Sequence, residues 1–353
     1  MKKIVRILLA AVLSVSAFAF TACGKKDGDG TAATREALKA EFLAAANGVT
    51  VAETSVTFKD ASDAESVTVQ KNPGNVMNLY ASFTTLWYEA GGTAAGVIGG
   101  AASIELYNEY IGRDITKDPG VWVAATSSSA KNWSPENIIA KQPQLIICST
   151  AMSGYSTISG PAAAANIPVI AVDYNDFSDY LKWFKVFSNL SGHPELYESV
   201  ALAALEEVLD VIMKVPADNR PVVFSMFKGT NSLEANTSGT VVGAMAKQLG
   251  ATNIADSWQN DAGADRLPIN LESVLDAAPA CILVQCHDAD EVTTALIQTT
   301  YGDNPVWNAL DAVKNNKVYY LPKTLFHNKP NRKFAEAYKL MAQKLYPGVN
   351  FDE

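Results

Sequence analysis

One segment pattern occurs twice in this chain and constrains the fold more than any other feature of the sequence. Residues 134–148 read S-P-E-N-I-I-A-K-Q-P-Q-L-I-I-C, and residues 270–284 read N-L-E-S-V-L-D-A-A-P-A-C-I-L-V. In both, a residue that can cap a helix precedes a glutamate in the first helical turn, a proline ends the helix, and an apolar run typical of a strand follows. The repeat predicts two lobes with duplicated folds.

Short apolar runs alternate with helical stretches along the rest of the chain, a pattern typical of parallel sheets covered by helices. The expected strands are 76–81, 121–124, 145–148 and 169–172 in the first half, and 222–226, 282–285 and 318–321 in the second. We also expect a helix over 31–47 and an edge hairpin over 54–70. The sequence therefore predicts an α/β fold of two similar Rossmann-like lobes with mostly parallel sheets.

The clearest helix lies between the two halves, over residues 193–215. Pro194 suits the first helical position, Lys214 favours the carboxyl end, and Pro216 prevents continuation. Apolar residues recur at helical spacing, so one face should be buried. At 1.5 Å per residue such a helix is roughly 30 Å long. We expect it to join an N-terminal lobe (48–192) to a C-terminal lobe (216–353).

The first residues have the features of an export signal. Basic residues precede an apolar run over 7–20, and small residues stand just before Cys23, as in a bacterial lipobox. The run is shorter than the roughly 18 residues that a membrane-spanning helix needs, which disfavours a permanent anchor helix. An ordinary signal peptide is the other alternative. We expect a signal peptide over 1–22, a lipid on Cys23, and a tether with a helix over 23–47, which places the protein outside the cytoplasm, anchored to the cell membrane.

Composition argues against other classes of function. The formal net charge is −9 and no block of basic residues occurs, which argues against nucleic-acid binding. Cys148, Cys281 and Cys286 lie in or beside apolar runs, so we expect them to be buried as small hydrophobes. The three histidines are far apart in sequence, which leaves little from which to build a dedicated metal site. We expect no resident cofactor.

Further motifs fall in an order that points to a family. They are E-A-G-G-T-A-A-G-V (89–97), N-I-P-V-I-A-V-D (166–173), Q-L-G-A-T-N-I-A-D (248–256), N-P-V-W-N-A-L-D-A-V-K-N-N-K-V-Y-Y-L-P (304–322) and K-P-N-R (329–332). With the repeated segment and the linking helix, they make the chain resemble the bacterial ABC-transporter binding proteins for siderophores, haem and cobalamin. The resemblance implies two lobes joined by one long helix, with a small metal chelate captured between them and delivered to a membrane permease.

The resemblance also gives a role to the glutamate of each repeated segment. In the family this side chain lies on the transporter-facing surface of its lobe and pairs with basic residues of the permease, and Glu136 and Glu272 occupy the matching positions. Two carboxylates in equivalent places would help to orient docking. The alternative is that each glutamate only stabilises the start of its helix.

Ligands of open α/β sheets lie beyond the carboxyl ends of the strands, so we expect ligand-binding residues in the loops there. Aromatic rings can cover a flat ligand, and hydroxyls and cations can hold its polar rim. The candidates are Ser82, Phe83, Thr84, Thr126, Ser127, Ser128, Ser149, Thr150, Tyr155, Phe227, Lys228, Trp258, His287, Phe326, His327, Lys329 and Arg332. His327, Tyr155 or Tyr174 could reach a metal ion, and the sequence does not select among haem, cobalamin, a siderophore complex or another chelate.

A second hypothesis is an enzyme that resembles the metal chelatases, and a third is a metal-ion capture lipoprotein on the same fold. The sequence contains no G-x-S-x-G elbow, no H-E-x-x-H, no Walker loop and no G-x-G-x-x-G after a strand. Paired acids such as Glu206 and Glu207 are explained by solvation of a helix face. We therefore expect a monomeric binding protein without catalytic residues, whose partners are a metal-chelate ligand and an ABC permease.

Overall fold

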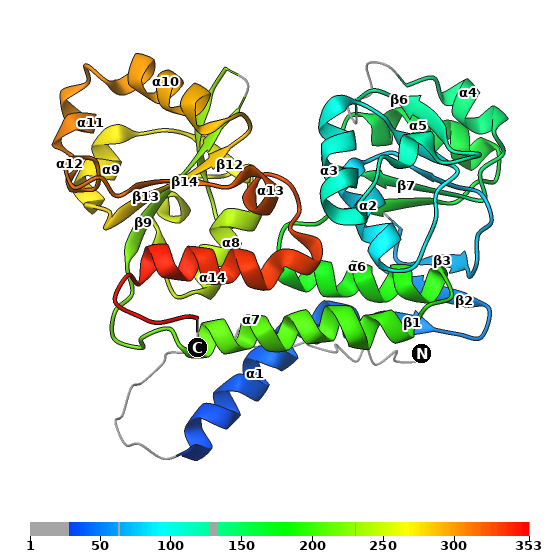
Figure 1. Ribbon diagram of the computed structural model, residues 1–353, viewed down its shortest axis with the longest axis horizontal. Helices are drawn as coiled ribbons and strands as arrows, with labels where there is room; N and C mark the ends of the chain where they lie inside the picture. Colours follow the sequence, from blue (N-terminus) through cyan, green and yellow to red (C-terminus); the bar gives the residue numbers. More distant parts are fainter. Residues whose placement is uncertain (1–27, 63, 128–132, 230, 353) are drawn as a thin grey trace, which may run out of the picture.

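The computed structural model of the chain describes residues 28–62, 64–127, 133–229 and 231–352. Two α/β lobes stand side by side over a base of long helices (Figure 1). Each lobe is built on its own central sheet. The predicted fold class, with two similar lobes of mostly parallel strands, is confirmed.

The central sheet of the N-terminal lobe is parallel throughout. Its strands are β4 (Val76–Asn78), β5 (Gly96–Ile98), β6 (Trp122–Ala125), β7 (Leu145–Ser149) and β8 (Val169–Val172), in the spatial order β6-β5-β4-β7-β8. The connecting helices are α2 (Ala81–Glu89), α3 (Ala101–Ile111), α4 (Pro135–Ala140) and α5 (Gly154–Ala164). The strand order reverses between β4 and β7, and doubly wound sheets bind ligands beside such a reversal.

A helix and a small antiparallel sheet precede this lobe. They are α1 (Gly28–Asn47), β1 (Thr50–Val51), β2 (Ser55–Phe58) and β3 (Val67–Gln70), which confirm the expected helix and hairpin. Helix α1 packs on α6 (Phe177–Leu190). Arg35 and Lys39 of α1 form ion pairs of 2.7 and 2.5 Å with Glu206, which tie α1 to the helix that joins the lobes.

The sheet of the C-terminal lobe is mixed. Its strands are β9 (Val222–Lys228), β10 (Leu233–Asn236), β11 (Thr252–Asn253), β12 (Arg266–Pro268), β13 (Cys281–Cys286) and β14 (Val318–Leu321). The order is β12-β10-β9-β13-β14 with β11 beside β9, and β10 and β12 run antiparallel to their neighbours. The helices of this lobe are α8 (Val241–Gln248), α9 (Leu271–Ala277), α10 (Asp290–Tyr301), α11 (Pro305–Ala309), α12 (Asp311–Lys314), α13 (Lys323–Phe326) and α14 (Phe334–Leu345). Its short 3₁₀ turns are η4 (Ile254–Ser257) and η5 (Asn331–Lys333), and the N-terminal lobe has a similar turn, η1 (Ile115–Lys117).

The helix that joins the lobes is present but begins in a different helical form from the predicted one. Its first part, η3 (Tyr197–Leu202), is π-helical, and its second part, α7 (Ala203–Met213), is α-helical. The π-helical part packs on α6, and α7 packs on α14 of the C-terminal lobe. Figure 1 shows it crossing beneath both lobes, as a connection that supports the two sheets from one side.

The two repeated segments fold alike. Ser134 Oγ at the start of α4 and Asn270 Oδ1 at the start of α9 each accept a hydrogen bond from the amide three residues later, at 3.2 and 3.1 Å. Each segment then passes through a residue with positive φ, Gln142 (50°) or Ala278 (46°), just before its proline. Both helices lead into the strand beside the central one of their sheet, β7 next to β4 or β13 next to β9. The duplication seen in the sequence is therefore a duplication of structure.

A cluster of buried aromatic rings joins the lobes at the base. The ring centroid of Phe334 on α14 lies 4.9 Å from that of Phe177 and 5.4 Å from that of Tyr180, both on α6. Tyr174, which leads into α6, stacks on the same ring at 6.2 Å. Each of these residues is at most 1% exposed. Because tight aromatic packing resists displacement, the two lobes share one core here and are held together firmly.

Candidate functional site

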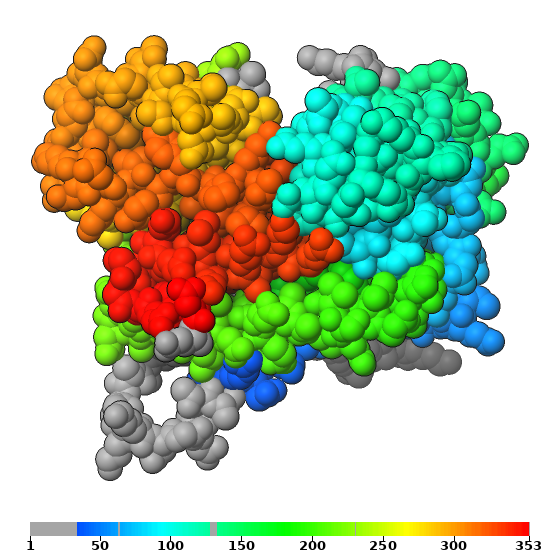
Figure 2. Space-filling view, in the orientation of Figure 1, coloured from blue at the N-terminus to red at the C-terminus, as the bar shows by residue number. Residues whose placement is uncertain are grey.

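A cavity of about 520 Å³ lies between the lobes. In Figure 2 a notch separates the lobes at the top of the view, above the orange segment that reaches from the C-terminal lobe toward the cyan helices. The N-terminal lobe contributes residues that follow β4, β5, β6 and β7, and the C-terminal lobe contributes residues at the ends of β9 and β13. The cavity therefore lies at the carboxyl ends of the strands, where α/β sheets bind ligands.

A larger hollow, of about 830 Å³, lies at the other edge of the N-terminal sheet. It is lined by residues that precede β7 and β8, such as Gln144 and Pro168, and by residues of β3. Amino ends of parallel strands are not the usual ligand side of such a sheet. The cavity between the lobes is the stronger candidate despite its smaller volume.

Arg266 is the main cation on the C-terminal wall of the cavity. Its guanidinium carbon lies 4.0 Å from the ring centroid of Phe227, and its Nε donates a 3.2 Å hydrogen bond to Asn236 Oδ1. The stacking fixes the plane of the guanidinium. Burial lowers the pKa of Arg266 from its usual value, and the group remains a cation at neutral pH. Its two terminal nitrogens suit a carboxylate or another anionic oxygen pair.

A network of buried amides supports this wall. Asn236 is fully buried, and its Nδ2 donates to Gln285 Oε1 at 3.0 Å and to Ser225 Oγ at 3.2 Å. Gln285 Nε2 donates in turn to the carbonyl oxygen of Phe326 at 2.7 Å. Because these amides are hydrogen-bonded on both sides, they hold the wall in one arrangement.

Two imidazoles meet at the cavity. The ring centroids of His287 and His327 are 4.8 Å apart in an edge-to-face arrangement, and His327 stacks on Phe227 at 6.0 Å. His287 Nδ1 lies 3.1 Å from Asp288 Oδ1, and Lys228 also pairs with Asp288. These partners, Lys228 first and then His287, lower the pKa of Asp288. With Nδ1 engaged, His287 has Nε2 left for a ligand.

His327 is neutral in this environment. Burial, with His287 as the next cause, lowers its pKa to about 4. Its Nδ1 is buried and has no hydrogen-bond partner among the described residues. The imidazole therefore offers a lone pair or a single N–H to a ligand and no positive charge.

Lys329 connects the cavity to the N-terminal lobe. Its ammonium donates a hydrogen bond to the carbonyl oxygen of Tyr174 and lies 5.0 Å from that ring centroid. Burial lowers the pKa of Lys329 to about 8, although the nearby carboxylate of Asp173 acts in the opposite direction. Lys329 is thus a cation at neutral pH, and with Arg266 it makes the cavity favourable for an anionic ligand.

The N-terminal wall is made of small and hydroxyl-bearing residues around the start of α3. A β-carbon at Gly100 would lie 2.0 Å from the carbonyl oxygen of Thr126, so glycine is required for this close approach. Gly100 is the N-cap of α3 and supplies no side-chain cap. The first amides of α3 therefore lie at the cavity as additional donors for an anion.

The structure brings together part of the sequence-predicted site. Of the predicted residues, those that line the cavity are Thr126, Ser127, Phe227, His287, Phe326, His327 and Lys329. Ser128 lies outside the described residues. The cavity also contains Asn328, which lies between the predicted His327 and Lys329, and residues that were not expected, namely Tyr80, Asn175, Asp265, Arg266 and Gln285.

The first predicted loop is placed differently. Strand β4 ends at Asn78 and α2 begins at Ala81, so Ser82, Phe83 and Thr84 are helical and buried instead of lining the cavity. Phe83 packs beside Tyr80, with ring centroids 4.7 Å apart. Tyr80, the residue before the helix, takes the place at the cavity that was expected for the loop.

The residues predicted after β7 also lie outside the cavity. Ser149 is buried, and its Oγ accepts a 3.2 Å hydrogen bond from the amide of Ala151. Thr150 Oγ1 lies 3.4 Å from the carbonyl oxygen of Val172, and Tyr155 packs against the core of the lobe. These side chains shape the turn that brings Ala151 and Met152 to the cavity.

Three further candidates have structural partners elsewhere. Lys228 is 1% exposed and supports Asp288 from behind the cavity wall. Trp258 packs on Phe224 in the C-terminal core, with centroids 6.2 Å apart. Arg332 faces the carboxyl group of Glu89 in the contact between the lobes. Their placement corrects the prediction that they line the cavity.

Glu136 and Glu272 occupy matching positions on the two lobes. Each is exposed in the first turn of its helix, α4 or α9. Ser134 Oγ lies 3.2 Å from Glu136 Oε2, so this carboxylate also takes part in its own helix start. Both carboxylates are accessible to a partner.

No helix among residues 28–62, 64–127, 133–229 and 231–352 is long and apolar enough to cross a membrane. Over the same part of the chain, no group of three or more His, Cys, Asp or Glu side chains is arranged to hold a metal ion.

Comparisons with known proteins agree with this geometry. A family model described as periplasmic binding protein matches residues 116–325, more than half of the chain. An ABC transporter substrate-binding protein from Listeria monocytogenes EGD-e superposes with a TM-score of 0.62 at 18% identity, covering 79% of this chain and 100% of that one. S. aureus IsdE complexed with heme superposes with a TM-score of 0.63 at 16% identity, covering 77% of this chain and 98% of that one.

The periplasmic catecholate-siderophore binding protein VctP from Vibrio cholerae is similar as well. Its TM-score is 0.59 at 16% identity, with 83% of this chain and 100% of that one covered. Among curated proteins, none matches this sequence. The family model, which matches more than half of the chain, shows that the chain belongs to the periplasmic binding protein family.

Proposed function

We propose that the chain is the extracytoplasmic binding protein of an ABC importer, which captures a metal chelate between its lobes and docks on the permease. The observation that carries the proposal is the composition of the cavity at the strand-order reversal. There the ring of Phe227 and the guanidinium of Arg266 form one surface, and hydroxyls such as Thr126 face it. Sites with aromatic walls and a few fixed polar groups suit small planar or apolar ligands with a polar rim.

The proposed ligand is an iron-siderophore, haem, cobalamin or a similar chelate. Arg266 and Lys329 complement carboxylate or catecholate oxygens, and the imidazoles of His287 and His327 could reach the metal of the chelate. The similarity to IsdE, whose structure contains heme, and to VctP, described as a catecholate-siderophore binding protein, supports this class.

Delivery would require attachment and docking. We propose that Cys23, which lies outside the described residues, carries the lipid that holds the protein on the outer side of the membrane. The exposed carboxylates of Glu136 and Glu272 would then pair with basic residues of the permease. The equivalent positions of these two glutamates on the duplicated helices support a two-point contact.

We further propose that the protein acts as a monomer and has no catalytic activity. The chelatase and metal-ion capture alternatives receive less support, since the matching family model is described as periplasmic binding protein and the similar protein from Listeria monocytogenes is an ABC transporter substrate-binding protein. A monomer is sufficient because one chain supplies both walls of the cavity.

The test is ligand binding to the purified protein. Hemin, cobalamin and ferric catecholate complexes are added in turn, and absorbance and thermal unfolding are followed. A ligand at about 100 times its Kd stabilises the folded state by about 2.7 kcal/mol, which raises Tm by several degrees. A shifted Soret band or such a rise with one chelate is the expected result. No response to any of these complexes would contradict the proposal.

A further inference from the structure

One stretch of chain both lines the cavity and contacts the opposite lobe. Residues 323–333 contain α13 and η5 of the C-terminal lobe. Phe326, His327 and Lys329 line the cavity, and η5 begins two residues after Lys329 and packs on α2 of the N-terminal lobe. Figure 2 shows this orange-red stretch lying against the cyan helices. We call residues 323–333 the strap. The residues that line the cavity and the residues that contact α2 are close together along the strap. A shift of the strap on α2 should therefore also move the cavity wall.

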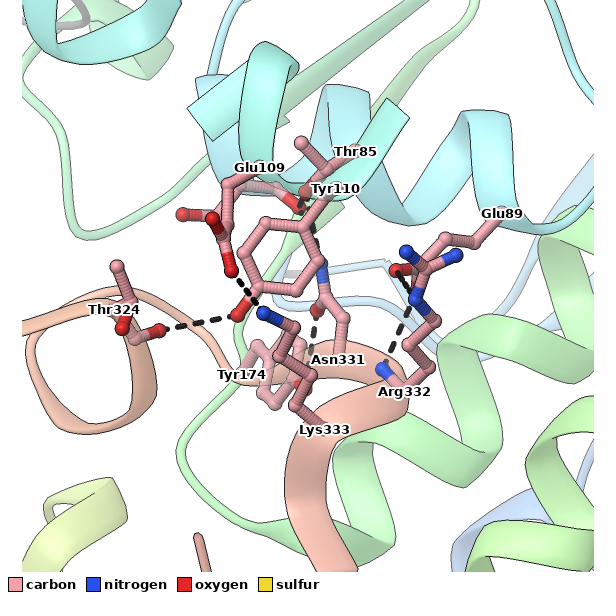
Figure 3. Close-up of polar contacts among 10 residues, drawn as sticks. Thr85, Glu89, Glu109, Tyr110, Tyr174, Thr324, Asn331, Arg332 and Lys333 are labelled. Atoms are coloured by element: carbon pink, nitrogen blue, oxygen red, sulfur yellow. Dashed lines mark hydrogen bonds and ion pairs between the residues drawn. The ribbon is translucent and has the colours of Figure 1, made fainter. Parts of the chain in front are cut away.

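Asn331 is the fixed point of the strap. It is fully buried, and its Nδ2 donates hydrogen bonds to the carbonyl oxygen of Ser82 at 3.1 Å and to Thr85 Oγ1 at 2.9 Å. The hydroxyl of Tyr174 lies 3.4 Å from Asn331 Oδ1. Its φ of 51° is in the left-handed region, which asparagine tolerates better than most residues. Figure 3 shows Thr85 and Tyr174, both of the N-terminal lobe, on either side of Asn331 from the strap.

Polar contacts flank this point on the side of α3. Tyr110 donates a 3.0 Å hydrogen bond to the carbonyl oxygen of Thr324, and Lys333 pairs with Glu109 (Figure 3). Both Glu109 and Lys333 are partly exposed, so this ion pair is screened by solvent and contributes little to the contact.

Glu89, at the end of α2, is the exception among these contacts. Its side chain is 3% exposed, yet its Oε1 has no hydrogen-bond partner among the described residues. Arg332 is its nearest cation, with Nε 3.7 Å from Oε1 and the backbone amide 3.4 Å from Oε2. Arg332 itself is 48% exposed. A buried carboxylate with such long contacts is poorly compensated for the loss of water.

The surroundings of Glu89 favour its neutral form. Burial raises its pKa to about 8, and Arg332 and Lys333 only partly oppose that rise. The titratable groups that interact with Glu89 come from α3, from α6 and the residues before it, and from η5. They are Tyr110 on α3, Tyr174 before α6, Tyr180 on α6, and Arg332 and Lys333 on η5, with Glu109 and Glu336 farther out beside Tyr110. The three tyrosines are neutral at physiological pH, so they supply no positive charge to hold a carboxylate.

We infer that Glu89 makes the contact between strap and N-terminal lobe sensitive to protonation, so that the cavity holds its ligand more tightly when Glu89 is protonated and less tightly when it ionises. The inference rests on the proposed binding function. When the strap separates from α2, Glu89 meets water and returns to its usual pKa near 4.5. Between pH 4.5 and 8 the docked state then binds more protons than the separated state, so docking weakens as pH rises, by up to about tenfold per pH unit.

The test compares the wild type with Glu89→Gln, a neutral variant of nearly the same shape, and uses Glu109→Gln as a matched control on the neighbouring helix. Thermal unfolding of the ligand-free protein is measured from pH 5.5 to 8.5. We expect the wild type to lose stability relative to Glu89→Gln as pH rises, and Glu109→Gln to follow the wild type. Parallel profiles for the wild type and Glu89→Gln would overturn the inference.

The ligand arm uses hemin as the probe over the same pH range. The dissociation rate of hemin should increase with pH in the wild type and change less in Glu89→Gln. Equal pH dependence in both would overturn the link between the strap and the ligand. If hemin binds neither protein, the proposal that haem is the ligand fails. The unfolding profiles still decide the role of Glu89.

A second variant covers the case in which Glu89→Gln does not fold. Arg332→Met removes the half-exposed cation that lowers the pKa of Glu89. The pH range over which the contact weakens should then extend to higher pH. An unfolding profile that coincides with the wild type at every pH would contradict the role of this pair.

Discussion

The guanidinium of Arg266 lies over the ring of Phe227, 4.0 Å from its centroid, and this pair forms the charged face of the cavity between the lobes. The two residues come from β12 and β9, which are joined only through β10. Asn236 on β10 accepts the hydrogen bond from Arg266 Nε that fixes the pair. A cation held in this way loses little side-chain freedom when a ligand binds, which favours affinity.

Replacement of Arg266 tests this arrangement. Arg266→Ala removes a charge-assisted contact and should weaken the binding of an anionic chelate such as hemin by roughly 10- to 100-fold. Arg266→Lys keeps the charge but loses the flat guanidinium, so it should recover only part of the affinity. Titration followed by absorbance measures both. Arg220→Ala, at an exposed position away from the cavity, is the control, and equal affinities for all variants would exclude Arg266 from the site.

Arg266 was not predicted as a site residue, and the reason is physical. Strands such as β8 and β13 were predicted because they are buried runs of apolar residues. Strand β12 is Arg-Leu-Pro and β10 is Leu-Glu-Ala-Asn, both on the antiparallel side of a mixed sheet, and neither has the pattern of a buried strand. Short strands with polar residues become strands only through their partners, so sequence periodicity does not detect them.

The misplaced loop after β4 has a different cause. The strand was expected over 76–81, but β4 ends at Asn78. Leu79 is buried in the core although it lies outside the strand, so the apolar run is longer than the strand. The strand ends at Asn78, and the site therefore begins at Tyr80 and not at Ser82. In contrast, Thr126 and Phe326 were correctly placed at the cavity: Thr126 directly follows β6, and Phe326 ends the short helix α13 that follows β14.

The shared aromatic core should limit how far the lobes move. Phe334→Ala leaves a cavity among Phe177, Tyr180 and Tyr174, and we expect a loss of about 3–5 kcal/mol in the free energy of unfolding. Denaturant unfolding measures this loss, with Val292→Ala as a control at a position 52% exposed, where the change should stay within about 0.5 kcal/mol.

The same aromatic core should keep the two lobes from moving far apart or together. Small-angle scattering of the wild type should therefore show little change in radius on ligand binding. A large change would contradict a firm base.

The lowered pKa of His327 leads us to expect that the folded protein loses stability in acid. Its pKa is about 4 in the folded protein against an ordinary value of 6.5, so the unfolded chain binds more protons between these values. Stability should therefore fall as pH decreases from 6.5 to 4, by up to about 1.4 kcal/mol per pH unit. His327→Phe can keep the stacking on Phe227 and should remove this part of the decrease. His193→Asn, at an exposed histidine, should behave like the wild type, and the opposite pattern would refute the assignment.

Attachment to the membrane depends on Cys23 in our proposal. Cys23→Ala should release the protein into the soluble fraction if the signal peptide is still cleaved. In our proposal the fatty chains on Cys23 provide the membrane affinity, and none of the described helices is able to cross a membrane. Cell fractionation with and without labelled palmitate measures this. Cys148→Ala serves as the control because that thiol is buried in the N-terminal core. Continued membrane association and labelling of Cys23→Ala would disprove lipidation at this residue.

Docking through Glu136 and Glu272 can be separated from ligand binding. Both carboxylates lie in the first turns of duplicated helices and outside the cavity, so the double variant Glu136→Gln, Glu272→Gln should bind the chelate with unchanged affinity. Uptake into cells that carry the permease should fall several-fold, since rim charges mainly steer and orient association. Glu207→Gln, another exposed glutamate but on α7, should leave uptake intact. If the double variant transports as well as the control, the two glutamates serve their own helices, and the permease must recognise another part of the lobes.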